Sequence, residues 1–170
     1  FFCMSFSSAI SLRTVLTGSD AQVDSLDASS KNDSSIMSLS GSVSLFGVTA
    51  GGVAVNVNTI DDTTQTRLDD GGLGGATDGT VKAAAEGAAR ITSLAVAGAV
   101  SQGVAVGGSS STNFINSAVE STATGLHGLA ADTDPAVADA LSVTAKQNGT
   151  IASLAGAVSI GSSTAVGGAL

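Results

Sequence analysis

Three stretches of the chain decide its fold: I-M-S-L-S-G-S-V-S at residues 36–44, I-T-S-L-A-V-A-G-A-V-S at 91–101 and I-A-S-L-A-G-A-V-S at 151–159. Within them, larger apolar side chains alternate with serine, alanine or glycine, and this period of two is typical of a β-strand. The stretches resemble one another and are regularly spaced along the chain. We therefore expect β-strands that recur roughly every 55–60 residues.

Other features keep the same offsets. N-T-I at 58–60 aligns with N-F-I at 113–115 by the shift that takes Ile36 to Ile91. A-V-G-G at 105–108 recurs at 165–168 by the shift that takes Ile91 to Ile151. Because independent anchors agree on the spacing, the repeat is not a chance match.

The charges follow the same period. None of the twenty charged residues (14 acids and 6 bases) lies in 34–60, 91–119 or 147–170. Each unit thus has a long uncharged portion and a shorter portion rich in Asp and Gly, which suits loops because these residues tolerate positive φ. Interleaved Gly, Ser, Thr and Asn in the uncharged portions argue against transmembrane helices, so we expect no membrane-spanning segment.

The middle unit illustrates the expected strands. They lie near 80–86, 89–101, 103–115 and 117–124, and an irregular loop follows at 125–139. Four strands in a unit of this length predict two turns of a parallel β-solenoid.

The predicted fold class is therefore all-β, a repetitive parallel β-solenoid (β-helix-like) with three units and uncapped ends. It forms a single domain over 1–170, with units of approximately 1–79, 80–139 and 140–170, the last incomplete. A-A-A-E-G-A-A-R at 83–90 is the segment that most favours a helix instead.

Composition excludes some classes of function. Charged residues make up 12% of the chain and the net charge is −8, so nucleic acid is a poor partner because phosphate binding needs clustered Lys and Arg. With no Trp, no Tyr and 22 Gly, the chain must form a core from small side chains in closely approaching layers. The lone cysteine, Cys3, excludes an intrachain disulfide, and its apolar neighbours predict a buried thiol.

At this point the sequence resembles a family. N-T-I followed by D-D-T-T-Q-T-R-L, then V-K-A-A-A, I-T-S-L-A-V-A-G-A-V-S and A-V-G-G resembles the repeats of giant filamentous exoproteins, the leukotoxin-like filamentous adhesins and haemagglutinin-type proteins of Gram-negative bacteria. The resemblance covers the chain from about position 20 to position 170. It implies a right-handed β-helix-like stalk exported to the cell surface for adhesion or matrix, and it supplies no catalytic residues. Cys3-Met4-Ser5 departs from the pattern, because N-x-I is expected there.

Candidate chemistry is sparse. His127 is the only histidine, in G-L-H-G-L, and no G-x-S-x-G motif marks a serine nucleophile, so we expect no enzyme and no catalytic or cofactor-binding residues. The run G-G-L-G-G-A-T-D-G from Gly71 lacks the liganding Asp of a calcium nonapeptide. Asp69, Asp70 and Asp78 remain weak candidates for Ca²⁺, because carboxylates on a turn suit a hard cation. Asp132 and Asp134 are weaker ones still.

Further patterns have simpler interpretations. N-D-S at Asn32 and N-G-T at Asn148 match a glycosylation triplet, but such triplets are frequent in Ser/Thr-rich sequence, and Asn148-Gly149 favours a turn. T-Q-T at 64–66 and T-A-T at 122–124 match the ranks of an ice-binding solenoid, without further ranks.

The sequence predicts a structural function. We expect a segment of an extracellular filament or bacterial surface adhesin stalk that associates with itself end to end or belongs to a longer chain, with a host-cell or matrix surface as a further partner. Any secretion signal would then lie outside these residues. The alternative is a β-solenoid module that binds calcium or a glycan through its charged loops.

Overall fold

The computed structural model describes residues 2–17, 25–69, 80–125 and 141–170, and these contain strands and short turns but no helix. The longest strands have 21 or 22 residues, which corresponds to about 70 Å of extended chain. The strands are β1 (Phe2–Thr17), β2 (Ser25–Leu45), β3 (Thr49–Asp69), β4 (Thr80–Ser101), β5 (Val104–Thr124), β6 (Leu141–Gly161) and β7 (Thr164–Ala169).

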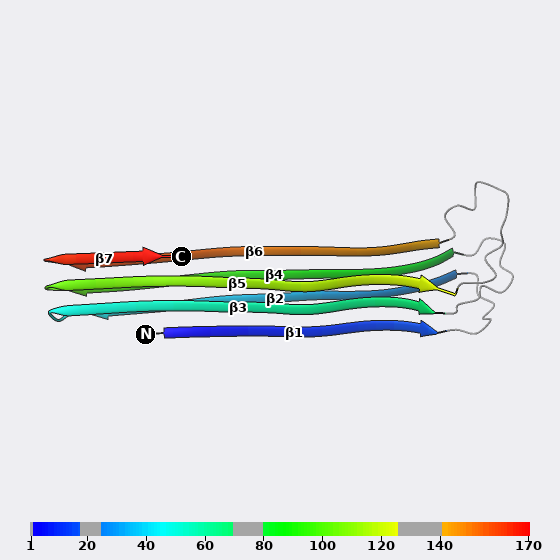
Figure 1. Cartoon of the computed structure of the whole chain (residues 1–170), viewed down its shortest axis with the longest axis horizontal. Coiled ribbons are helices and arrows are strands. Elements are labelled where there is room, and N and C mark those ends of the chain that lie inside the picture. The colour runs from blue at the N-terminus through cyan, green and yellow to red at the C-terminus, as the bar shows by residue number, and fades with distance from the viewer. Residues whose placement is uncertain (1, 18–24, 70–79, 126–140) are drawn as a thin grey trace.

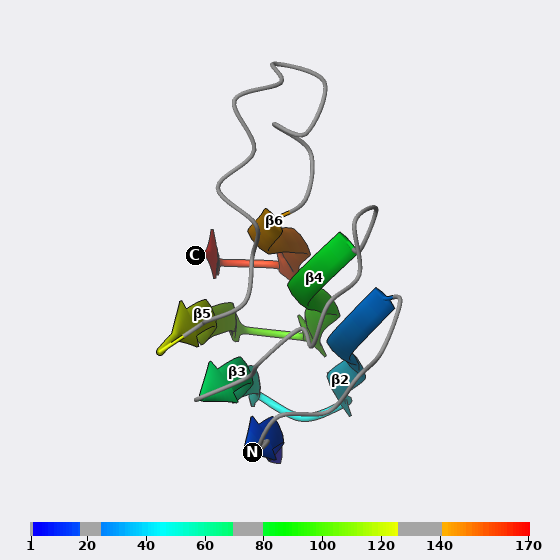
Figure 2. The same cartoon turned by 90° about the vertical axis from the view of Figure 1, so that its right-hand side faces the viewer.

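All the strand pairs are parallel, and they form two sheets with the orders β1-β3-β5-β7 and β2-β4-β6. Successive strands therefore alternate between the sheets. All the strands run along the long axis of the molecule (Figure 1), and seen end-on the sheets stand as two facing columns (Figure 2). The prediction of an all-β, parallel fold is confirmed. The helix considered for 83–90 was wrong, because these residues lie within β4.

The register between strands reproduces the offsets of the sequence. Ile36 lies opposite Ile91, and Ile91 lies opposite Ile151. In the other sheet Asn58 lies opposite Asn113. Residues aligned by sequence alone are thus neighbours in one sheet.

The first strand keeps a different register. Phe6 lies opposite Asn58, whereas the repeat predicts Cys3 at that position. The predicted alignment of Cys3 was therefore wrong by three positions.

The number of strands was also predicted wrongly. Residues 80–124 form two strands, β4 and β5, and not four. The expected break near Gly87 does not occur, because this glycine serves packing: a Cβ there would lie 2.6 Å from Cγ2 of Val119 on β5. Each repeat offset corresponds to one strand in each sheet.

Short turns carry the chain from one sheet to the other. After β2 the turn contains Phe46 (φ 69°) and Gly47 (φ 128°). The N–H of Gln102 in the next turn donates to the carbonyl of Gly47 at 2.9 Å, and the N–H of Ser163 in the last turn donates to that of Gly103 at 3.2 Å. The turns thus stack on one another as the strands do.

Alternate side chains face the space between the sheets, and most of these are small or polar. On β2 the inward residues are mainly serines: Ser40 is 1% exposed, whereas the outward Met37 and Leu39 are 85% and 64% exposed. Small and larger side chains alternate along the strand as predicted, but the serines face the interior and the larger apolar side chains face outward. Small inward side chains allow two sheets to approach closely along their whole length.

Larger apolar side chains form a few clusters in this interior. Ile36, Ile60 and Ile91 pack together, with Ile115 against them. Another cluster joins Leu68 to Val81 and small alanines near the opposite end of the strands from the turns. The apolar core is therefore a set of rows that run across the strands.

Candidate assembly interface

Charged side chains on the outer face of β2, β4 and β6 pair between directly opposite residues. Lys82 Nζ lies 3.6 Å from Asp27 Oδ2, and Lys31 Nζ lies 3.6 Å from Glu86 Oε2. Glu86 also lies 3.8 Å from Lys146 through its other oxygen. Each exposed pair contributes little stability, but opposite charges in one row disfavour a slipped register.

Polar rows also run across the outer face of β3 and β5. Gln65 Nε2 donates to Glu120 Oε2 at 2.8 Å, and Thr124 Oγ1 donates to Asp69 Oδ1 at 2.7 Å. Arg67 Nε lies 2.6 Å from Asp69 Oδ2. The hydrogen bond from Arg67, then that from Thr124, holds the pKa of Asp69 below its usual value.

The interior contains matching polar rows. Ser93 Oγ is hydrogen-bonded to Ser111 Oγ at 2.8 Å and to Ser153 Oγ at 3.0 Å. Ser30 Oγ lies 2.6 Å from Thr66 Oγ1. These buried polar groups thus find partners in the facing or the next strand, which ties the two sheets together.

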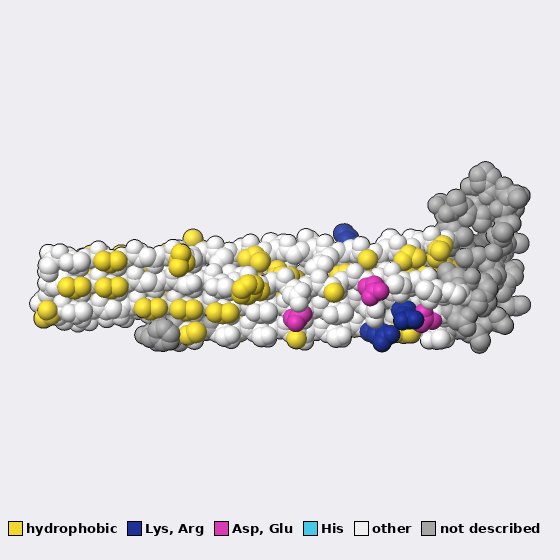
Figure 3. Space-filling view, viewed as in Figure 1, with side chains coloured by type: hydrophobic (Ala, Val, Ile, Leu, Met, Phe, Trp, Pro, Cys, Tyr) yellow, Lys and Arg dark blue, Asp and Glu magenta, His cyan; other side chains and the backbone are white. Residues whose placement is uncertain are grey.

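Apolar side chains gather on the outer faces near the turns. Figure 3 shows them over the sheet of β1, β3, β5 and β7, with the charged groups toward the other end. The exposed apolar residues on the outer face of β2, β4 and β6 include Met37, Leu39, Val43, Val96, Leu154 and Val158.

The inner face of β1 is only half covered. β3 and β5 each lie between two strands of the facing sheet, whereas β1 contacts β2 alone among the strands of that sheet. Its inward side chains Phe6, Ile10, Leu12 and Leu16 therefore stay 37–41% exposed, although their counterparts on β3 are buried.

The inner face of β6 is uncovered in the same way. Its inward Leu141, Val143 and Ile151 are 44%, 42% and 49% exposed, while the residues opposite them on β4 are at most 1% exposed. β7 covers β6 only near the turn. Two open apolar surfaces thus lie at opposite ends of the stack of strands.

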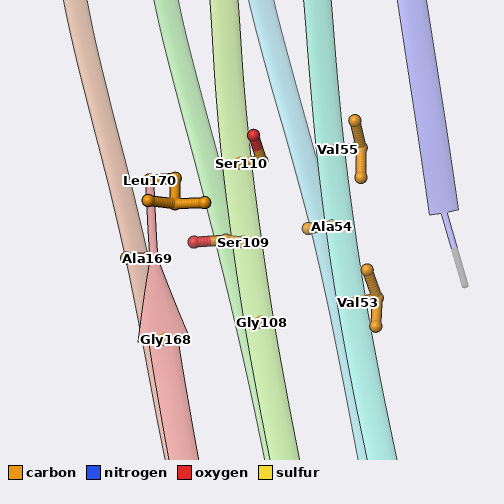
Figure 4. Close-up of a pocket in the computed structure, with 9 residues that line it drawn as sticks. All are labelled: Val53, Ala54, Val55, Gly108, Ser109, Ser110, Gly168, Ala169 and Leu170. Carbon is orange, nitrogen blue, oxygen red and sulfur yellow. The ribbon is translucent and has the colours of Figure 1, made fainter.

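An apolar hollow of about 360 Å³ crosses β3, β5 and β7 where β7 ends. Figure 4 shows Val53 and Val55 on one side, Leu170 and Gly168 of β7 on the other, and Gly108 of β5 between them. Because these glycines have no side chains, the outer face is recessed there.

The predicted candidates for metal binding and catalysis are not brought together by the described residues. His127, Asp70, Asp78, Asp132 and Asp134 lie outside them. Asp69 is described, and its carboxylate is engaged by Arg67 and Thr124. Within the described ranges no cluster of three His, Cys, Asp or Glu side chains has the arrangement of a metal site.

Asn32 points inward and is 6% exposed, so its N-D-S triplet is not presented to a glycosylating enzyme by the folded strand. Two other expectations were wrong. Asn148 lies inside β6 and not in a turn. Cys3, expected to be buried, is exposed on β1.

The two T-x-T motifs do not form ranks on one surface. Thr64 and Thr66 point inward and are buried. Thr122, by contrast, lies opposite outward Arg67. The flat array of threonines that ice binding requires is therefore not formed by these motifs.

In the described part of the chain, there is no helix with the length and apolar content to cross a membrane. Comparisons of the chain with protein families, with curated proteins and with solved structures find no match. The conclusions on function therefore depend on the geometry of the chain itself.

Proposed function

We propose that this chain is a structural repeat segment of an extracellular filament or bacterial surface adhesin stalk. Its three repeat units form one β-solenoid with uncapped ends, which associates end to end with further copies or continues into further units. Its function is to supply length and stiffness and not to catalyse a reaction. Adhesion and the cell-surface location come from the resemblance of the repeats to filamentous exoproteins.

The single observation that carries the proposal is the repetition of one register from strand to strand, which places Ile36, Ile91 and Ile151 side by side in one sheet. Inward apolar side chains of β1 and β6 are about half exposed, whereas those of the strands between them are buried. Edge strands with free backbone groups and apolar faces recruit further strands unless they are capped. A stack whose strands repeat in one register suits extension by further units.

Imaging of the purified chain tests this proposal. Since strands lie about 4.8 Å apart and the two sheets contain four and three strands, we expect fibres with a rise of roughly 14–19 Å per copy. Their width would be set by strands of about 70 Å. Negative-stain microscopy should show the fibres, and fibre diffraction should show the strand spacing along the axis.

Sedimentation and thermal melting measure the outcomes that would contradict this proposal. A monodisperse monomer at every concentration, without fibres, contradicts self-association. A melting temperature that falls on addition of EDTA would instead favour the calcium-binding module. No contact among the described residues supports that alternative. Asp69 is the one aspartate of the predicted calcium set that the structure describes, and its carboxylate is already paired with Arg67 and Thr124.

A further inference from the structure

We propose that the outer face of β2, β4 and β6 near the turns packs against the same face of a second copy of this chain, with the strands of the two copies antiparallel. This contact joins copies side by side, and it therefore goes beyond the end-to-end extension proposed above. The decisive residues lie on β4, which is paired on both of its edges.

The face is apolar, and none of the described residues covers it. On β2, Met37, Leu39 and Val43 are 85%, 64% and 74% exposed, and on β6, Leu154 and Val158 are 65% and 61% exposed. The three repeated stretches that form the face contain no charged residue. Because monomeric proteins rarely expose a contiguous apolar patch of more than a few hundred Å², such a face indicates an interaction surface.

Valine and glycine give the face a regular relief. They alternate from strand to strand, in opposite order in two successive outward rows: Gly41, Val96 and Gly156 in one row, and Val43, Gly98 and Val158 in the next. Each row therefore has recesses where the other row has projecting side chains.

The fold of a single copy does not require these glycines. A Cβ at Gly41 or Gly98 would come no closer than 3.8 Å to another atom, and at Gly156 it would meet nothing within 4 Å. None of the three has a positive φ. At the inward Gly87, by contrast, a Cβ would lie 2.6 Å from Val119. Since glycine within a strand weakens it, the outward glycines point to a neighbour outside the copy.

A two-fold axis midway between the two rows makes the face complementary to itself. The axis lies in the plane of contact and perpendicular to the strands, so it sets Val96 of each copy against Gly98 of the other. It also sets Leu39 of each copy against Leu45 of the other. Valines would then enter the glycine recesses, as side chains interdigitate in a steric zipper, and the same residues would serve both copies.

The charges distinguish this arrangement from the parallel one. With an axis along the strand direction through β4, the outward Lys82, Glu86 and Arg90 would each face the same residue of the second copy. Like charges directly opposite one another are destabilising. In the antiparallel arrangement, these rows project past the turns of the second copy, because β4 ends at Ser101. The charged side chains then stay in water.

The area of the face indicates when copies pair. From the row of Met37 to that of Leu45, three strands cover about 27 Å by 14 Å, roughly 400 Å². A stable interface buries about 800 Å² on each partner. One copy supplies half of this area and two stacked copies supply all of it, so we expect side-by-side pairing to be strongest within fibres.

Cross-linking tests the register in the full chain. In a Cys3→Ala background, chains with Leu39→Cys are mixed with chains with Leu45→Cys. The two cysteines would face each other across sheets about 10 Å apart, so a short bismaleimide should give a dimer band on a denaturing gel. Either variant alone places its cysteines about 20 Å apart along the strands and should stay monomeric. Thr92→Cys alone is the control for the parallel arrangement, because only there would these cysteines face each other.

A swap of valine and glycine tests the relief. Gly98→Val sets valine against Val96 of the second copy and should lower the yield of cross-linked dimer by about fivefold or more. Val96→Gly with Gly98→Val exchanges recess and projection, so the faces fit again, and the yield should return to within about twofold of the parent. Circular dichroism checks that both variants fold.

The outcomes separate the pairing from the proposed function. Fibres without the cross-link between positions 39 and 45, a yield indifferent to Gly98→Val, or a dimer of Thr92→Cys alone overturn the pairing and leave the filament intact. Equal cross-linking in every mixture would show unspecific aggregation and would also overturn the pairing. Binding to phosphatidylcholine vesicles without cross-links would assign the face to a lipid surface instead. Cross-links without fibres support the pairing and contradict end-to-end extension, and the absence of both overturns both.

Discussion

Asn58 and Asn113 lie one above the other inside the molecule, and Nδ2 of Asn58 donates a 2.7 Å hydrogen bond to Oδ1 of Asn113. The two residues are far apart in sequence and directly opposite in adjacent strands. Amide side chains stacked in this way form ladders that stabilise one register of the paired strands. Such rows stabilise an interior that contains few large apolar side chains.

Loss of this amide pair should be costly. Asn113→Ala leaves Nδ2 of fully buried Asn58 without its partner, and we expect a loss of about 1–3 kcal/mol in the free energy of unfolding. Urea denaturation followed by circular dichroism measures it. The control is Asn116→Ala, whose hydrogen bond to Asp61 is exposed, and its effect should stay below about 0.5 kcal/mol. Equal losses in both variants would contradict the ladder.

The isoleucine row offers a second test. Ile91 is fully buried between Ile36 and Ile60, so Ile91→Ala should lower the free energy of unfolding by about 2–5 kcal/mol through lost burial and a cavity. Met37→Ala removes a side chain of similar size that is 85% exposed, and it should change the free energy by less than about 0.5 kcal/mol. Denaturant titrations of the two variants check the contrast, and a reversed order would contradict the observed orientation of β2.

The sequence predicts the strands and their spacing because both follow from local period and from internal repetition. It does not predict which face is inside. The alternation of Leu39 with Ser40 allows either face to point inward, and the choice depends on how closely the facing sheet approaches. Apolar clusters such as Ile60 with Ile36 and Ile91 of the facing sheet then hold the two sheets together.

The sequence does not predict the register of β1 on β3 for a related reason. Its serines and phenylalanines share no anchor with Asn58 and Ile60, so only the paired backbone reveals its different offset. The repeat predicts end-to-end association in general terms.

The pH dependence of stability should carry a signature of Asp69. Its pKa lies below the usual value of about 4, first because Arg67 donates a hydrogen bond to it and then because Thr124 does. A depressed pKa in the folded state contributes stability above the unfolded pKa, and this contribution is lost as the pH falls through the folded pKa. Below about pH 4 the parent chain should therefore lose stability more steeply than Asp69→Asn.

Carboxyl titration by NMR provides the direct measurement. Arg67→Ala should raise the pKa of Asp69, because it removes the hydrogen bond that lowers this pKa most. Arg90→Ala, on the other sheet, is the matched control and should leave that pKa where it is. An unchanged pKa in Arg67→Ala would show that the contact does not persist in solution.

Two glycines should respond in opposite directions to the same substitution. A Cβ at Gly103, in the turn before β5, would collide with the carbonyl oxygen of Val48 in the preceding turn. Gly103→Ala should therefore cost about 1–3 kcal/mol, as overpacking does. At Gly156 a Cβ would meet nothing within 4 Å, so Gly156→Ala should stabilise the fold by about 0.4–1 kcal/mol by restricting the unfolded chain. Thermal melts of both variants measure the difference. The N–H of Val104 donates to the carbonyl of Val48 at 2.9 Å, which fixes the close spacing of the stacked turns. If alanine were tolerated at Gly103, the turns would have to lie farther apart than this hydrogen bond implies.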